Sequence, residues 1–258
     1  MRVTATVQAR MGSSRLPGKV LKAVRGKPLL QIQIERICRS RLVDEMIVAT
    51  TVNPADDVIA DLAGKLGVGC YRGSEDDVLG RIAGLIRAHQ VELHVELIGD
   101  SPLTDPQIVD EMIGVFLKSN GAFDYVSNGT ALTYPSGMEV NVYPGAVLLD
   151  AETHVAATDP TREHVDIHIS KNPRFCCHLV TAPPWFRRPD LFLEVDTPRD
   201  FEMMSALIGH FFDVGKGHFS LAEILDYLDH NPALAALNRN EPRRWWAFKD
   251  KAPEGHRA

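Results

Sequence analysis

Apolar runs long enough for buried strands alternate with helically spaced apolar positions along residues 1–120 of the chain. The strands are predicted at residues 3–9, 45–51, 70–71 and 93–98, and the helices at 29–40, 56–66, 74–86 and 108–116. A repeated strand–helix order is typical of a parallel sheet that helices cover on both faces. Ligands bind such sheets at the carboxyl ends of the strands. We therefore predict an α/β fold whose site is formed by the loops that follow the strands.

The pattern of apolar and polar positions is weaker in the second half of the chain. We predict strands at residues 124–127, 138–143 and 175–182, a short apolar run at 191–195, and helices at 161–170, 198–208 and 220–230. From Asn238 onward Arg, Trp, Lys, Pro and Gly predominate, which predicts a poorly ordered tail. No segment has the composition of a linker, so we predict a single domain over residues 1–235 and a C-terminal tail over 236–258.

The composition is that of an ordinary globular protein with an acidic balance. Apolar residues make up 45% of the 258 positions, and the net charge is −6. Such a chain lacks the excess of Lys and Arg on which nucleic-acid and membrane-surface binders depend, so any anion site must be local. No run approaches the ~20 apolar residues of a membrane span, and the chain begins with a strand rather than a signal sequence. We expect a cytoplasmic protein with reduced cysteines and without nucleic-acid or membrane partners.

The loop after the first predicted strand gathers groups that bind phosphate. Its three cations supply charge, its glycines let backbone N–H groups approach an anion, and its serines add hydroxyl donors. Five residues separate the two glycines and Val20 follows the lysine, so the loop is not a Walker A motif. A solvated basic turn is the alternative interpretation. The candidate residues are Arg10, Gly12, Ser13, Ser14, Arg15, Gly18 and Lys19.

Two aspartates stand where they could hold a metal ion. Asp100 follows the predicted strand at 93–98 and can reach a ligand over the sheet, although a turn aspartate that bonds its own backbone is an equally good interpretation. Asp196 ends the apolar run before Thr197 and Pro198, which is also good helix-capping chemistry. The residues alone leave both alternatives open.

The segment Gln-Ala-Arg-Met-Gly-Ser-Ser-Arg-Leu-Pro-Gly-Lys, residues 8–19, resembles the nucleotide-binding loop of the cytidylyltransferases that activate acidic sugars. These are the acylneuraminate and 3-deoxy-manno-octulosonate type, and the chain is most similar to the spore coat polysaccharide biosynthesis protein F-like branch. The resemblance extends from residue 1 to about residue 235. It implies a Rossmann-like nucleotide-diphospho-sugar transferase fold. It also implies a reaction in which CMP passes from CTP to a sugar, which we expect to be acidic, with release of pyrophosphate for surface polysaccharide or glycan synthesis.

The resemblance also implies roles for individual residues. Gly99-Asp100-x-Pro102 resembles the family's metal-binding turn, and Asp196-Thr197-Pro198 resembles a late segment whose aspartate shares the same Mg²⁺. Asp100 would act in catalysis with the three loop cations, which would neutralise the triphosphate. The implied nucleotide contacts are Ala9, Arg10, Gly12, Ser13, Ser14, Arg15, Lys19, Arg72, Ser74 and Asp76, with the backbone near Ala9 and Arg10 reading the pyrimidine. The implied acceptor contacts are Tyr134, Glu139, Arg162, Glu163 and His164.

One position departs from the family pattern. Glu96 stands in the predicted strand at 93–98 where relatives often carry arginine, and a negative charge there leaves the acceptor's identity open. Family members of this type commonly dimerise through the region after the metal-binding turn. Residues 130–180 contain enough apolar segments to supply such a surface, so we expect a homodimer.

Three other functions compete with this prediction. A related enzyme could use another nucleotide or a sugar 1-phosphate. A glycosyltransferase is disfavoured because its metal site usually has Asp-x-Asp, whereas Asp100 is followed by Ser101 and Pro102. A non-catalytic nucleotide-binding scaffold is disfavoured because the loop cations and both aspartates are retained together.

Overall fold

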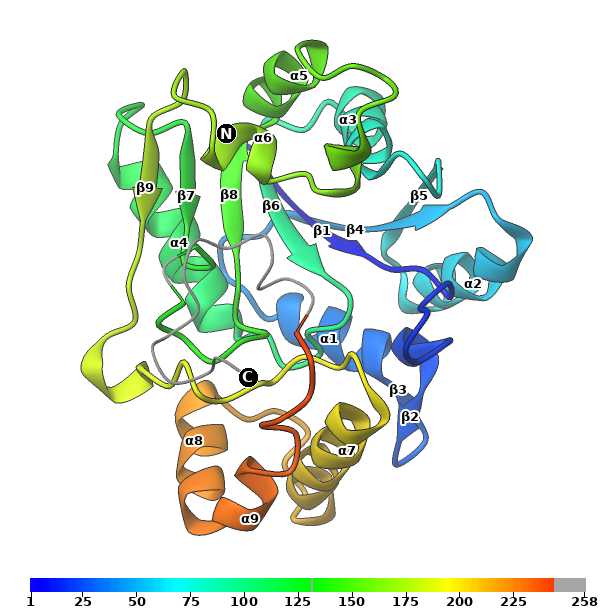
Figure 1. The fold of residues 1–258 in the computed structure, drawn as a ribbon, viewed down its shortest axis with the longest axis vertical. Helices are drawn as coiled ribbons and strands as arrows, with labels where there is room; N and C mark the ends of the chain where they lie inside the picture. Colours follow the sequence, from blue (N-terminus) through cyan, green and yellow to red (C-terminus); the bar gives the residue numbers. More distant parts are fainter. Residues whose placement is uncertain (131, 244–258) are drawn as a thin grey trace.

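A seven-stranded sheet lies at the centre of the computed structural model, which describes residues 1–130 and 132–243 (Figure 1). The strand order is β5-β4-β1-β6-β8-β7-β9, and only β8 runs antiparallel to its neighbours. The predicted mostly parallel α/β sheet is therefore confirmed. The strands are β1 (Val3–Gln8), β4 (Glu45–Thr51), β5 (Gly69–Gly73), β6 (Leu93–Ile98), β7 (Tyr125–Ser127), β8 (Asn141–Pro144) and β9 (Cys177–Leu179), with a separate hairpin of β2 (Ala23–Val24) and β3 (Lys27–Pro28).

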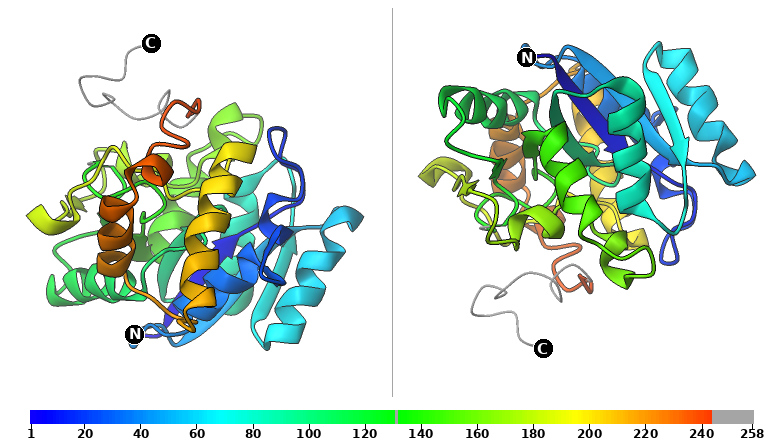
Figure 2. Two further views of the ribbon diagram at one scale, coloured as in Figure 1. Left: turned by 90° about the horizontal axis from the view of Figure 1, so that it is seen from below. Right: turned by 90° about the horizontal axis from the view of Figure 1, so that it is seen from above.

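Helices pack against both faces of the sheet. In Figure 2 the yellow α7 and orange α8 lie towards the viewer in the left view, and green and teal helices lie towards the viewer in the right view. One hydrophobic cluster joins the sheet to α1, α2, α4, α7 and α8, and a second joins the other face to α3, α5 and α6. No helix among the described residues is long and apolar enough to cross a membrane. The helices are α1 (Leu29–Ile37), α2 (Asp57–Leu66), α3 (Val78–His89), α4 (Pro106–Lys118), α5 (Gly145–Thr153), α6 (Ile167–Ser170), α7 (Pro198–Asp213), α8 (Leu221–His230) and α9 (Pro232–Ala235), with 3₁₀ turns η1 (Lys19–Leu21), η2 (Pro54–Asp56), η3 (Pro160–Glu163) and η4 (Pro184–Phe186).

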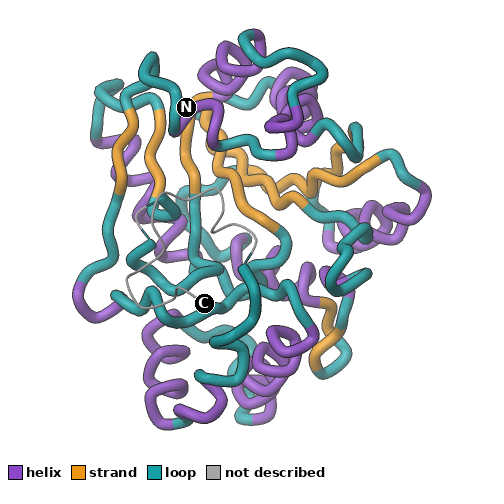
Figure 3. Tube along the Cα trace, in the orientation of Figure 1, coloured by secondary structure: helices purple, strands orange, loops and turns teal. Residues whose placement is uncertain are grey.

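The second half of the chain differs from the predicted elements. The predicted helix at 161–170 is divided into η3 and the short α6, and the predicted strand at 175–182 is reduced to β9. Helix α5 is absent from the prediction because it begins at Pro144-Gly145, a pair typical of turns. The apolar run at 191–195 is extended, with a single bridge between Ser136 and Phe192. Figure 3 shows that most of the chain between β9 and α7 is loop.

The expectation of a poorly ordered tail from Asn238 onward is wrong for residues 238–243. Asn238 is 1% exposed and Arg243 is 5% exposed, because both bind the buried carboxylate of Asp200. The remainder of the predicted tail, residues 244–258, lies outside the described part of the chain.

Gly99, at the end of β6, lies against the end of β1. Its N–H donates to the Gln8 carbonyl at 2.9 Å, and a Cβ atom added to it would lie 2.7 Å from the same oxygen. Gly99→Ala must therefore separate β1 from β6 locally, and we expect it to lower the free energy of unfolding by about 1–3 kcal/mol in urea titrations. Gly114→Ala in α4 is the matched control. Its Cβ would meet nothing within 4 Å, so the same change should raise stability by about 0.5–1 kcal/mol. Equal responses of the two variants would contradict the close-approach argument.

Candidate active site

The loop between β1 and η1 is folded tightly on itself. The Gly18 N–H donates to the Met11 carbonyl at 3.0 Å, and the Leu16 N–H donates to the Ser13 hydroxyl at 3.3 Å. Gly18 has a left-handed φ of 66°, which glycine adopts readily, and the chain then enters η1 at Lys19. This turn directs Lys19 back towards the carboxyl ends of the strands, where it meets two other loops.

Lys19 joins Asp100 and Asp196, which lie far apart in the sequence. Its Nζ donates to Asp100 Oδ2 at 2.9 Å and to Asp196 Oδ1 at 2.8 Å. Arg15 Nη2 lies 2.7 Å from Asp196 Oδ2. The structure thus brings together four of the predicted site residues as one charge cluster, which we call the Lys19 cluster (Arg15, Lys19, Asp100 and Asp196).

Lys19 and Asp196 are held in their charged forms by their partners in the Lys19 cluster. Burial alone would lower the pKa of Lys19, but the two carboxylates outweigh it and raise that pKa above its usual value. Burial likewise tends to raise the pKa of Asp196, but Lys19 and Arg15 outweigh it and hold the pKa below the usual range. The cluster has two basic and two acidic side chains, so its formal charges balance before any ligand binds.

Asp196 is not the cap of α7. The N-cap is Thr197, whose side chain accepts from the Asp200 N–H while the Asp200 side chain accepts from the Thr197 N–H, and Pro198 follows as the first helical residue. The Val195 N–H donates to the Asp100 carbonyl at 2.8 Å, which fixes the two aspartate-bearing segments side by side. The helix-capping interpretation of Asp196 is wrong, and its carboxylate is directed into the Lys19 cluster.

The oxygen donors fit a hard cation that arrives with phosphate. Mg²⁺ usually takes one or two protein carboxylates and completes its shell with phosphate oxygens and water. Asp100 and Asp196 supply two carboxylates that already share one cationic partner, the Lys19 ammonium. Within residues 1–130 and 132–243 no group of three or more His, Cys, Asp or Glu side chains could hold a metal without a ligand. The metal role of the pair remains a prediction.

The other predicted nucleotide contacts lie around the ends of β4 and β5. Arg72 donates to the carbonyls of Thr51 and Asn53 at 2.8 and 2.9 Å, so it braces the turn after β4. Ser74 and Asp76 are exposed, and the N-cap of α3 is Asp77. The Ala9 N–H already donates to the Ala49 carbonyl at 3.1 Å.

Gly12, on the loop between β1 and η1, has a close neighbour from elsewhere in the chain. An added Cβ on Gly12 would lie 2.9 Å from the carboxylate of Glu75. Ser14 lies on the same loop and is exposed.

The predicted acceptor residues come from two segments. Arg162 is buried and donates to both carboxylate oxygens of Asp77 at 2.9 and 3.0 Å, so it ties η3 to the start of α3. Glu163 lies next to it on the surface, 3.9 Å from Arg10, and His164 follows at the end of η3. These contacts place the 162–164 segment beside the nucleotide loop.

The second acceptor segment lies in the connection between β7 and β8. Tyr134 is buried, and its hydroxyl is 3.4 Å from Glu111 Oε2; burial and this carboxylate raise its pKa to about 12. Glu139 accepts from the Gly137 N–H at 2.7 Å. Acceptor binding by either segment remains a prediction.

Glu96 is not the negative charge that the sequence suggests. Its side chain is buried beneath the site, accepts from Gln8 Nε2 at 2.6 Å and from the Tyr143 hydroxyl at 2.9 Å. Burial, reinforced by the nearby Asp166, raises the pKa of Glu96 to about 8. The carboxyl is therefore mostly neutral at pH 7. With Gln8 and Tyr143 it forms an uncharged hydrogen-bonded group beneath the loops, so it would not repel an anion.

Sequence patterns missed Glu194, Asp200 and Arg243. Glu194 is two residues before Asp196 in an extended segment, so both side chains lie on one face. Burial, with Glu139 nearby, raises the pKa of Glu194 to about 7. The i, i+2 spacing of Glu194 and Asp196 was the signal that could have revealed the first of these residues.

This arrangement defines a class of protein. A mostly parallel sheet whose carboxyl edge gathers a cationic loop and two carboxylates is the architecture of a nucleotidyltransferase. The chain belongs to the cytidylyltransferase family, because the family model described as "Cytidylyltransferase" matches residues 4–203.

Two relatives match nearly the whole chain. An uncharacterized protein of Methanocaldococcus jannaschii is 34% identical over 93% of this chain and 96% of its own length. The spore coat polysaccharide biosynthesis protein SpsF of Bacillus subtilis is 33% identical over 89% of this chain and 95% of its own. The predicted family and branch are thereby confirmed.

Solved structures confirm the predicted nucleotidyltransferase fold. A cytidylyltransferase from Leptospira borgpetersenii has a TM-score of 0.85 and 27% identity, over 94% of this chain and 99% of that one. A CMP:2-keto-3-deoxy-manno-octonic acid synthetase in complex with CTP has a TM-score of 0.60 at 19% identity, over 81% of this chain and 99% of that one. At that identity the second similarity concerns the fold alone.

Glu96 should make stability depend on pH. Its pKa is about 8 in the folded protein and near 4.5 in an unfolded chain, so the folded state binds more protons between these values and its stability falls as pH rises through them. Glu96→Gln removes this titration. The variant should gain stability relative to the wild type as pH rises from 5 to 8, by at most about 1.4 kcal/mol per pH unit.

Urea unfolding of both proteins at several pH values measures this difference. Glu202→Gln, on the exposed side of α7, is the control and should show no such trend. A constant difference between wild type and Glu96→Gln across the range would contradict a protonated Glu96.

Proposed function

We propose that this protein transfers CMP from CTP to an acidic sugar, with Mg²⁺ and with release of pyrophosphate, for surface polysaccharide or glycan synthesis in the cytoplasm. The observation that carries the proposal is the Lys19 cluster, in which loop cations meet two carboxylates at the carboxyl ends of β1 and β6. Membership of the cytidylyltransferase family supports the choice of CTP.

The loop cations would exchange partners when the nucleotide binds. Lys19 and Arg15 now pair with Asp100 and Asp196, and triphosphate oxygens would compete with these carboxylates for the same N–H groups. Each N–H that turns to phosphate leaves a carboxylate oxygen without that partner. Asp100 and Asp196 would then hold Mg²⁺, which supplies further positive charge to the phosphates.

The transfer itself needs little covalent chemistry from the protein. An acceptor hydroxyl would release its proton to solvent as its oxygen attacks the α-phosphorus, the bond to pyrophosphate would break, and negative charge would grow on the leaving group. Arg10, Arg15 and Lys19 lie on the loop that would receive that charge, and fixed cations in a partly buried site stabilise it without reorganisation. This requires no nucleophilic side chain.

The acceptor would lie between the two segments that carry Arg162, Glu163 and His164 on one side and Tyr134 and Glu139 on the other. An acidic sugar is supported by relatives named as 3-deoxy-manno-octulosonate cytidylyltransferases, such as that of Geobacter sulfurreducens, which is 39% identical over 44% of this chain and 44% of its own length. The neutral Glu96 would not repel such an acid at pH 7.

Calorimetric titration with CTP, GTP, UTP and ATP in Mg²⁺ tests the proposal. A clear preference for CTP is expected. Preference for another nucleotide would favour an enzyme that uses a different NTP, and absence of binding would favour a non-catalytic scaffold.

We also propose that the protein is a homodimer that uses residues in the range 130–180. Exposed Leu179, at the end of the edge strand β9, supports a contact in this region. Light scattering at micromolar concentration should give twice the mass of the chain, and a monomer mass would refute the proposal.

Removal of either carboxylate charge should abolish turnover. Asp100→Asn and Asp196→Asn should each leave the protein folded but reduce pyrophosphate release to background, because one ion needs both carboxylates. The double variant should be little worse than either single one, since residues that act as a unit are not additive.

Asp213→Asn is the matched control, because it removes a carboxylate from an exposed ion pair with Arg25 and should leave turnover unchanged. Near-normal activity of Asp196→Asn would remove Asp196 from the site. Since Thr197 is the cap of α7, a loss of activity could not be ascribed to loss of that cap.

A further inference from the structure

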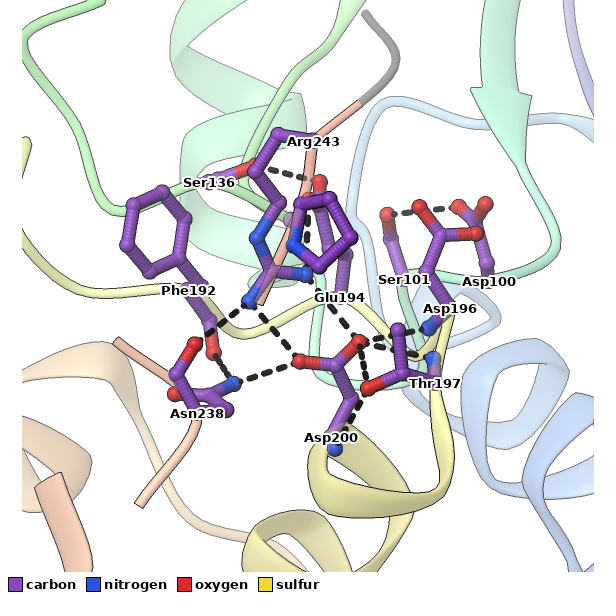
Figure 4. A network of polar contacts seen from close by, with 12 residues as sticks. Asp100, Ser101, Ser136, Phe192, Glu194, Asp196, Thr197, Asp200, Asn238 and Arg243 are labelled. Atoms are coloured by element: carbon purple, nitrogen blue, oxygen red, sulfur yellow. Dashed lines mark hydrogen bonds and ion pairs between the residues drawn. The ribbon is translucent and has the colours of Figure 1, made fainter. Parts of the chain in front are cut away.

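Residues 238–243, which we call the C-terminal strap, run from the end of α9 back to the carboxyl edge of the sheet (Figure 1). The strap lies over the segment that carries Phe192, Glu194 and Asp196, and Figure 4 shows the polar contacts between them. The strap therefore lies beside the proposed transfer site, although it stands outside the 4–203 range of the family model.

Arg243 anchors the strap. Its side chain is 0% exposed, and its Nη1 and Nη2 donate to the two carboxylate oxygens of Asp200 at 3.0 and 2.8 Å (Figure 4). Nη1 also lies 3.3 Å from Glu194 Oε1, and the guanidinium is 4.4 Å from the centre of the Phe192 ring. A bidentate and stacked guanidinium is held in one orientation, which lysine cannot reproduce.

Asp200 connects Arg243 to the backbone of residues 196 and 197. Its Oδ2, which accepts from Arg243, also accepts from the N–H groups of Asp196 and Thr197 at 3.0 and 2.8 Å. The carboxylate that holds Arg243 thus also fixes the turn that presents Asp196 to Lys19. A change in the position of Asp200 would change the position of the Asp196 carboxylate.

Glu194 connects Arg243 to the segment that carries Ser136. It is buried two residues before Asp196 and accepts from the hydroxyl of Ser136, whose neighbour Gly137 binds Glu139. Arg243 thus pairs with a carboxylate on each side of Asp196 in the sequence: Glu194 before it and Asp200 after it.

The strap also contacts the nucleotide loop. The carbonyl of Pro242, next to Arg243, accepts from Arg15 Nη1 at 2.9 Å, while Arg15 Nη2 binds Asp196. The guanidinium of Arg15 is consequently held between the strap and the Asp196 carboxylate. The position of Arg243 thus bears on two members of the Lys19 cluster.

We propose that Arg243 is a positioning residue of the transfer site: through Asp200 it fixes the turn that presents Asp196, and through the adjoining Pro242 carbonyl it directs Arg15. This inference rests on the proposed function, because it assigns Asp196 and Arg15 to nucleotide binding. A purely stabilising role explains the contacts less well, since buried ion pairs are often no more stable than apolar side chains of the same volume.

The test compares full-length Arg243→Met and Arg243→Lys with the wild type. CTP is titrated calorimetrically in Mg²⁺ without acceptor, at a temperature where circular dichroism shows each protein to be folded. Arg243→Met should weaken CTP binding by about tenfold or more, the effect of one lost charge-assisted contact. Arg243→Lys keeps the charge without the paired N–H bonds, so it should recover part of this loss.

Two controls separate positioning from stability. Leu228→Ala removes a buried side chain from α8, away from the site, and should lower the melting temperature without changing CTP affinity. Arg199→Gln removes the strap's surface ion pair with Glu241, 3.7 Å long, and should also leave CTP affinity unchanged. If CTP affinity falls in Leu228→Ala as it does in Arg243→Met, the loss follows stability and the proposal is wrong.

Amide hydrogen exchange of the ligand-free proteins tests the same inference without nucleotide. The Asp196 and Thr197 amides should lose protection in Arg243→Met, less in Arg243→Lys, and not in Leu228→Ala. If the wild type does not bind CTP, the proposed function fails, whereas this exchange pattern still decides whether Arg243 fixes the turn.

If Arg243→Met does not fold, Arg243→Lys carries the test. An Arg243 variant that is folded, binds CTP as tightly as the wild type and keeps full protection at Asp196 and Thr197 would overturn the proposal.

Discussion

The contact between the Lys19 ammonium and the carboxylates of Asp100 and Asp196 joins three loops that no local structure would bring together. The loops follow β1, follow β6 and precede α7, and they meet because parallel neighbours place their carboxyl ends at one edge of the sheet. An ion pair of this kind is costly to bury unless its geometry is good, and here each partner is also a hydrogen-bond partner. The site is therefore formed before any ligand binds, with the Lys19 ammonium lying between the two carboxylates.

Charge balance extends from this contact towards the C-terminal strap. Among the contacts described here, the carboxylates of Asp100, Glu194, Asp196 and Asp200 share three cations: Arg15, Lys19 and Arg243. Burial raises the pKa of Glu194 to about 7, and the nearby Glu139 and Asp100 add to this rise. A region with this imbalance favours an additional cation, and a phosphate ligand that withdraws Lys19 and Arg15 would increase the imbalance further.

Sequence patterns predicted the parts of the fold that depend on regular spacing. The parallel strands and α1 to α4 follow from alternating apolar runs, and the segments around Asp100 and Asp196 follow from a family resemblance. The antiparallel pairing of β8 and the burial of Arg243 could not be predicted, because they depend on pairing and ion contacts between distant segments. Helix α5 was not predicted because it begins at a Pro-Gly pair typical of turns. Arg243 lies among Arg, Trp and Pro residues typical of an exposed tail, and only the position of Asp200 and Phe192 in space makes it a buried residue.

The two faces of the central strands explain why the charged side chains of the site lie on the loops, whereas the strand side chains beneath them are neutral. Val3, Ala5 and Val7 of β1 face the larger hydrophobic cluster, whereas Thr6 and Gln8 face the side covered by α3, α5 and α6 and bind His94 and Glu96 across the strand pair. Burial lowers the pKa of His94 to about 3 and raises that of Glu96 to about 8, so both side chains are mostly neutral at pH 7. The charged groups that we propose to bind phosphate thus lie on the loops, and the strands beneath them offer uncharged hydrogen-bonding groups. Such a division would let one sheet hold a highly charged nucleotide at its edge without bringing uncompensated charge into its core.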